Sequence, residues 1–120
     1  MSEFDARVRS QEEMATIDLS GTIDGGAEAV LDAAYVACGD AEARTVGLDF
    51  TDVDYINSTG IALLVSLLAK ARRDDRPVAA WGLSEHYREI FEITRLADFL
   101  EVVSDEEAAR AATDMTTGER

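Results

Sequence analysis

The order of strand-like and helix-like segments constrains the fold of this chain more than any other feature. Residues 45–50 alternate in polarity, which predicts a strand. A predicted helix over residues 58–73 follows, then a strand over residues 78–82 and a helix that begins at Ser84. Strands that alternate with helices favour a parallel sheet, because each helix returns the chain to the same edge. The sequence therefore predicts an α/β fold.

A predicted β-hairpin precedes this alternation. Residues 5–10 alternate weakly in polarity, and residues 14–20 alternate more clearly. Gly21 is expected to end the second strand, because glycine interrupts regular structure. A hairpin makes one pair of strands antiparallel, so the sheet as a whole is expected to be mixed.

A helix is predicted between the hairpin and residue 45. The Gly25-Gly26 pair indicates the turn before it, and Gly39 is expected to end it as a left-handed cap. Its apolar residues recur at helical spacing and are expected to form one buried face: Ala27, Val30, Leu31, Ala34 and Cys38.

A short strand over residues 100–103 and a helix over residues 105–112 complete the predicted elements. With 120 residues there is room for one domain, which we place at 1–112, followed by a flexible polar tail at 113–120. The predicted architecture is a single α/β domain with a mixed sheet of four to five strands and helices packed mainly on one face.

The charge of the chain restricts its partners. Eleven Lys and Arg against 25 Asp and Glu give a net charge of −14. Phosphate backbones and anionic membrane surfaces would repel such a chain, so nucleic acid and membrane are poor partners. The N-terminus lacks the basic and apolar pattern of a signal peptide, and we expect a cytoplasmic protein.

The composition also leaves little material for catalysis. One cysteine, Cys38, excludes an internal disulfide and a multi-cysteine metal cluster, and one histidine, His86, excludes His-pair metal sites. Ser58 lacks the glycine two residues earlier that a nucleophile elbow requires, because Ile56 stands there. We therefore expect no metal, no cofactor and no catalytic residue.

The segment between the predicted strand at 45–50 and the helix at 58–73 has the most specific pattern. A connection over residues 51–57 leads to Asn57-Ser58-Thr59-Gly60. Asn57 or Ser58 can cap the helix, because either side-chain oxygen can accept a bond from a free N–H of the first turn. The hydroxyls at 58 and 59 then lie where free N–H donors and the helix dipole favour a phosphate, although a plain helix cap is the simpler interpretation.

The helix over residues 58–73 is apolar on most of its circumference. Its predicted core face comprises Ile61, Leu64, Val65 and Leu68, while Ala62, Leu63, Leu67 and Ala69 make the other side almost as apolar. Such a helix is either packed on both sides or exposes an apolar strip that a partner covers. Both interpretations stay open.

Three stretches of the sequence resemble the STAS domain, and specifically the anti-sigma factor antagonists of bacterial partner-switching systems. They are Asp49-Phe-Thr-Asp-Val-Asp-Tyr-Ile-Asn-Ser-Thr-Gly-Ile-Ala62, Leu19-Ser-Gly-Thr-Ile-Asp24 and Ser84-Glu-His-Tyr-Arg-Glu-Ile-Phe-Glu-Ile-Thr-Arg-Leu96. They occur in the order and at the spacing of the family, over roughly residues 12–112.

The resemblance implies a phosphorylation switch in place of an enzyme. Ser58 occupies the position that an anti-sigma factor with serine kinase activity phosphorylates, and Thr59 is a second acceptor. Asp24 matches an early acidic position that helps to present the loop. The unphosphorylated form binds the anti-sigma factor, and a serine phosphatase restores it. The expected partner-binding residues are Asp24, Asn57, Ser58, Thr59, Gly60, Ile61 and Leu63. A monomer or weak homodimer is expected.

The sequence departs from the family pattern at Asn57, where aspartate is usual. Asparagine caps a helix as well as aspartate does, so the local fold should be kept while one negative charge beside Ser58 is lost. An alternative to the switch is an accessory subunit that docks on a transporter ATPase or another regulator without phosphorylation. A nucleotide sensor is a third alternative, but the chain has no phosphate-binding glycine loop.

Overall fold

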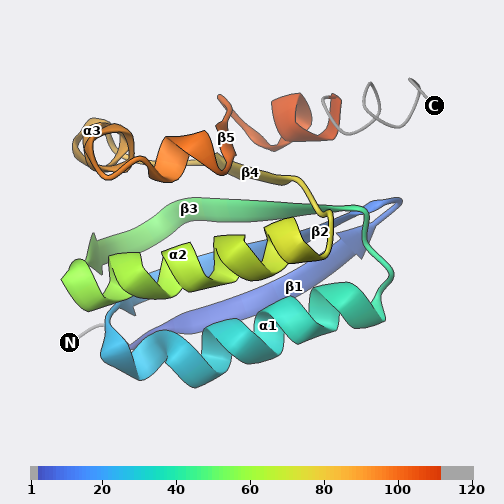
Figure 1. Cartoon of the computed structure of the whole chain (residues 1–120), viewed down its shortest axis with the longest axis horizontal. Coiled ribbons are helices and arrows are strands. Elements are labelled where there is room, and N and C mark those ends of the chain that lie inside the picture. Colours follow the sequence, from blue (N-terminus) through green and yellow to red (C-terminus); the bar gives the residue numbers. More distant parts are fainter. Residues whose placement is uncertain (1–2, 112–120) are drawn as a thin grey trace.

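The computed structural model describes residues 3–111 and contains one five-stranded sheet (Figure 1). The strands lie in chain order: β1 (Asp5–Gln11), β2 (Met14–Ile23), β3 (Thr45–Ile56), β4 (Val78–Trp81) and β5 (Glu101–Val102). β1 pairs antiparallel with β2, and the three further pairings are parallel. The predicted hairpin and mixed sheet are confirmed.

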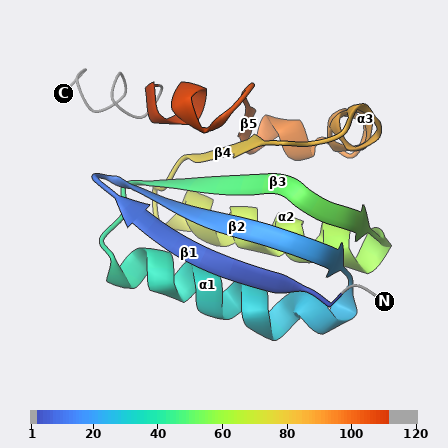
Figure 2. The same ribbon diagram turned by 180° about the vertical axis from the view of Figure 1, so that it is seen from behind.

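The helices connect the parallel strands. They are α1 (Glu28–Asp40), α2 (Ser58–Arg73) and α3 (Glu85–Ile93), with short 3-10 helices η1 (Gly25–Ala27) and η2 (Leu96–Asp98). Residues 106–111 are also helical, while position 112 and the predicted tail at 113–120 lie outside the described residues. α1 and α2 lie side by side on one face of the sheet (Figures 1 and 2).

The main core lies between the sheet and these helices. Ile17, Leu48 and Leu64 are buried there, and the rings of Phe50 on β3 and Phe91 on α3 meet edge to face at 5.7 Å. A smaller cluster on the other face of the sheet contains Met14, Ala79, Trp81 and Ala109. The helices therefore cover mainly one face, as predicted, and residues 106–111 cover part of the other.

Two predicted strand ends are wrong, because both strands are longer. β2 continues through Gly21 to Ile23, with a register shift on each side of Ser20 and Gly21. Gly21 has φ +88, so it accommodates the bulge inside the strand and does not end it. The connection predicted at residues 51–57 is mostly strand, since β3 runs to Ile56 alongside the extended β2.

Helix details also differ from the predictions. Gly39 lies inside α1, and Glu42, with φ +58, adopts the left-handed conformation expected of the glycine. Val30 is 36% exposed and so does not belong to the buried face of α1. Tyr35, which was not predicted to belong to that face, is buried. In α2 the bounds predicted are confirmed, but Val65 is exposed while Leu67 is buried, because the core face turns toward α1.

No helix within residues 3–111 has both the length and the apolar character that crossing a bilayer requires. In the same range no three His, Cys, Asp or Glu side chains come together in a way that could hold a metal ion.

Candidate functional site

Ser58 is exposed at the first position of α2, where β3 has just ended at Ile56. Asn57 is extended, with φ −90 and ψ −179, and its Oδ1 accepts a hydrogen bond of 2.8 Å from the N–H of Gly60. Of the two predicted cap residues, Asn57 is thus the one that caps the helix. The Ser58 and Thr59 side chains are left facing solvent at the positive end of the helix dipole.

The end of β2 lies directly beside this helix start. The N–H of Asn57 donates to the carbonyl oxygen of Ile23 at 3.2 Å, and a side chain at Gly25 would lie 3.5 Å from the Thr59 methyl group. Asp24, between them, accepts a bond of 2.9 Å from the N–H of Gly26. The structure therefore brings Asp24 close to the Ser58 loop, because β2 and β3 are parallel neighbours and their carboxyl ends meet at one edge.

Tyr87 is a residue of this site that the sequence did not reveal. Its hydroxyl accepts a hydrogen bond of 2.9 Å from the N–H of Ile56, two residues before Ser58. In the sequence, Tyr87 shares helical spacing with Ile90 and Phe91, which indicates no more than a common face. A contact across 31 residues depends on how α3 packs, so no local pattern could have indicated it.

The apolar strip on α2 is partly open. Ile61 and Leu63 are half-buried, and Ala62, Val65 and Ala69 are exposed, with Val65 at 46%. The alternative of full burial between sheet and helices is therefore wrong for this side of α2. An exposed apolar surface next to Ser58 is available to a partner.

The charges near Ser58 are all negative along the two segments that form the site. Residues 10–43 and 45–69 contain no lysine or arginine. Glu28, Asp52 and Asp54 are exposed on these segments. Basic side chains gather instead at the far end of α2, from Lys70 onward, about 18 Å along the helix axis from Ser58.

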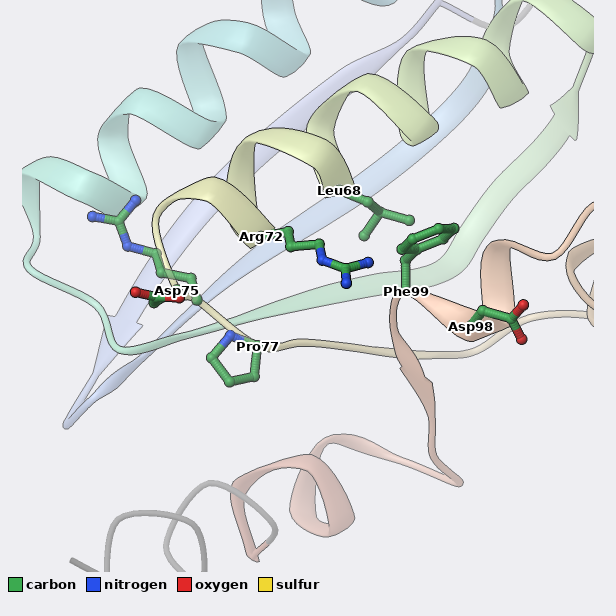
Figure 3. A pocket seen from close by; sticks show the side chains of 7 residues that line it. Leu68, Arg72, Asp75, Pro77, Asp98 and Phe99 are labelled. Carbon is green, nitrogen blue, oxygen red and sulfur yellow. The ribbon is translucent and has the colours of Figure 1, made fainter.

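The structure has hollows at both ends of α2. A cavity of about 190 Å³ lies beside the Ser58 loop, between the end of β3 and the start of α3, and Ile56, Ser84 and Tyr87 are among the residues that line it. A wider cleft of about 400 Å³ lies at the other end, where the guanidinium of Arg72 stands 5.5 Å from the centre of the Phe99 ring (Figure 3). Only the smaller cavity adjoins the site.

Cys38 and His86 are the two residues that the sequence analysis considered for metal binding and catalysis and set aside. Cys38 is buried in the main core, and burial raises the pKa of its thiol to about 11. A thiol with so high a pKa is a poor nucleophile at neutral pH. His86 is exposed and its ring lies edge-on to Tyr87 at 5.0 Å.

A family model described as "Mlab, STAS domain" matches residues 6–103. The chain belongs to the STAS-domain family. The match begins one residue into β1, continues beyond β5 and includes the whole Ser58 site, so the resemblance seen in the sequence is confirmed.

Named relatives of this STAS domain are anti-sigma factor antagonists. BtrV of Bordetella bronchiseptica, which bears that name, is 31% identical over 94 residues, 78% of this chain and 81% of the relative. The anti-sigma-B factor antagonist of Listeria monocytogenes is 33% identical over 61 residues, so the chain spans about half the length of that relative, 54%.

Solved structures share the fold. SpoIIAA, an anti-sigma factor antagonist solved in its unphosphorylated form, superposes with a TM-score of 0.68 at 18% identity, covering 97% of this chain and 99% of SpoIIAA. The Bacillus protein solved in its phosphorylated form gives 0.66 at 19% identity, over 92% of this chain and 99% of that one. At these identities the likeness shows the fold alone, and the predicted STAS architecture is confirmed.

Proposed function

We propose that this STAS domain is an anti-sigma factor antagonist of a bacterial partner-switching pathway. When Ser58 is unmodified, the domain binds an anti-sigma factor that is also a serine kinase. When Ser58 carries a phosphate, the complex dissociates. A serine phosphatase removes the phosphate and returns the domain to its binding form.

The observation that carries this proposal is the exposed Ser58 hydroxyl at the capped start of an apolar helix. A kinase can reach the hydroxyl without unfolding the domain. The N–H groups of the first helical turn and the helix dipole can accommodate the phosphate that results. The names of the curated relatives agree with this role and do not favour an accessory subunit of a transporter.

The phosphate must act locally. It adds about −1.5 to −2 charges to a chain that already carries −14, so the long-range field changes little. At about 6 Å, however, a partner carboxylate is repelled by on the order of 3 kcal/mol per unit charge at an effective dielectric constant near 20. Such a penalty weakens binding about a hundredfold. The phosphate also stands next to the half-buried Ile61, where close packing of a partner begins.

The partner surface comprises two adjacent segments. Asn57, Ser58 and Thr59 form the accessible start of α2, whereas the predicted Gly60 is buried against Ile23. The half-buried Ile61 and Leu63 flank the exposed Ala62 just beyond it. Asp24 contributes from the end of β2. Because the exposed side of this part of α2 is apolar, the matching surface of the anti-sigma factor is expected to be apolar there, with a carboxylate close enough to Ser58 to be repelled by the phosphate.

Two variants of the full chain test the proposal. Wild type, Ser58→Asp and Ser58→Ala are each titrated with the anti-sigma factor that the wild-type domain captures from its native cell, while circular dichroism reports the fold. We expect Ser58→Asp to weaken binding at least about tenfold with an unchanged spectrum, and Ser58→Ala to bind as wild type does.

Ser10→Asp is the matched control, because it adds the same charge at an exposed serine of β1 at the other end of the sheet, and it should bind as wild type does. Incubation with that partner and ATP should add the mass of one phosphate to the peptide that contains Ser58. Wild-type affinity in Ser58→Asp, or a phosphate on Thr59 alone, would contradict the assignment of Ser58 as the switch.

A further inference from the structure

β3 extends far beyond its neighbour β4. The two strands pair only from Val46 to Asp49 on β3, yet β3 continues to Ile56. On the other side β2 accompanies β3 as far as Ile56. The last residues of β3, which lead into the Ser58 loop, therefore have a strand partner on one side only.

Tyr87 supplies a partner on the open side. Its hydroxyl oxygen accepts the hydrogen bond of Ile56 N–H at 2.9 Å. The next N–H along the chain, that of Asn57, donates to Ile23 on the opposite side, and the Asn57 side chain then caps Gly60. Three hydrogen bonds, from the N–H groups of residues 56, 57 and 60, thus hold the backbone on both sides of Ser58, and only the first of them is made to another helix.

The start of α3 is itself firmly placed against β3. Ser84 caps α3 by accepting a bond of 3.3 Å from the N–H of Tyr87. Gly82, just before it, has φ +80, and a Cβ there would stand 2.6 Å from the backbone nitrogen of Thr51. Because the backbones at 82 and 51 approach so closely, the segment that leads into α3 is held against β3.

The space around this bond is not tightly filled. The cavity of about 190 Å³ lies between the end of β3 and the start of α3, and Val53, Asp54 and Ile56 line it from the β3 side. Side-chain packing therefore contributes less to the position of this segment than it does in the core. On the side away from β2, the hydrogen bond to Tyr87 is the specific constraint.

We propose that Tyr87 is a positioning residue for Ser58: its hydroxyl fixes the backbone at Ile56 and so sets how the loop presents the Ser58 hydroxyl. The consequence for phosphorylation and partner binding rests on the proposed function. The positioning itself does not, and it can be measured on the isolated domain.

Amide hydrogen exchange of the full chain, followed by NMR, tests the inference in Tyr87→Phe. We expect the Ile56 and Gly60 amides to exchange roughly fivefold to tenfold faster than in wild type, the range expected for the loss of one hydrogen bond. The buried Leu48 amide reports global opening, so its rate shows how much of the change comes from the stability of the whole domain. Faster exchange at Gly60 as well as at Ile56 is the decisive result. A hydrogen bond that only docks α3 on β3 would change the exchange rate of the Ile56 amide alone.

Tyr35→Phe is the matched control. It also removes one phenolic hydroxyl, which bonds to Asp74 at 2.7 Å near the far end of α2. We expect this variant to leave Ile56 and Gly60 unchanged. A Gly60 amide that keeps its wild-type rate in Tyr87→Phe, or accelerates equally in Tyr35→Phe, would overturn the inference. Failure of the proposed function would appear elsewhere, as a wild-type domain that takes no phosphate on Ser58.

Discussion

Gly60, the third residue of α2, packs directly on the carbonyl group of Ile23 at the end of β2, and a Cβ at position 60 would overlap that oxygen. This contact joins two segments that are 37 positions apart in the sequence, the end of the hairpin strand and the Ser58 loop. It holds the segment that contains Asp24 against the start of α2, and it explains why a glycine stands in the first turn of a helix, where it costs stability relative to alanine.

Gly60→Ala should therefore destabilise the domain by about 1–3 kcal/mol, because the gain in helix propensity is smaller than the cost of separating α2 from β2. Chemical denaturation measures the free energy of unfolding. Gly25→Ala is the control, since a Cβ there meets only the Thr59 methyl group at 3.5 Å. Equal stability of the two alanine variants would show that the close approach at Gly60 has no energetic weight.

Asn57 can be tested as a cap independently of any partner. Asn57→Ala removes the acceptor for Gly60 N–H and should cost about 1 kcal/mol. Asn57→Asp keeps the acceptor and adds a negative charge at the helix N-terminus, so its stability should equal or exceed that of wild type by up to about 1 kcal/mol. Urea denaturation of the three proteins decides between these outcomes. A loss of stability in Asn57→Asp would mean that the neighbouring negative charges outweigh the helix dipole.

Cys38 should make the stability of the domain depend on alkaline pH. Its pKa is raised to about 11 in the folded protein because burial disfavours the thiolate. Below the ordinary pKa of a cysteine, the thiol is neutral in both the folded and the unfolded chain, so ionisation does not lower the free energy of unfolding there. Between pH 9 and 11 the thiol ionises only in the unfolded chain, so the free energy of unfolding should fall by up to about 3 kcal/mol.

Cys38→Ala is the comparison for that experiment, and its stability should fall less over the same pH interval. Native protein should also resist iodoacetamide at pH 8 and react once denatured. Rapid alkylation of the native protein would contradict a buried thiol.

Gly47 and Trp81 lie in contact across β3 and β4. A Cβ at position 47 would stand 2.6 Å from the edge of the Trp81 ring. Gly47→Ala should displace the ring from the small cluster around Met14 and Ala109, with a loss of about 1–3 kcal/mol. Trp81 is the only tryptophan, so its fluorescence emission should shift to longer wavelength. An unchanged spectrum would show that residues 106–111 adapt to the larger side chain.

Much of the fold could be predicted because it depends on local patterns. The bounds of α2 follow from the Asn57 cap and from an apolar stretch of helical period, both visible in consecutive residues. The strands at residues 14–20 and 45–50 were recognisable for the same reason. Their extensions were not, since residues 51–56 are strand only because β2 accompanies them. Gly39 and Val30 were misassigned because the end and the buried face of α1 depend on what packs against it.

The sequence by itself determined the chemistry of this protein: a strongly acidic STAS domain with a serine after a helix-capping asparagine. Short-range hydrogen bonds and side-chain periodicity encode such features within a few residues. Only the tertiary structure decided which neighbours hold that serine, with Ile23 on one side and Tyr87 on the other. Those bonds join residues more than thirty positions apart, and they form only when the parallel sheet brings its strand ends to one edge.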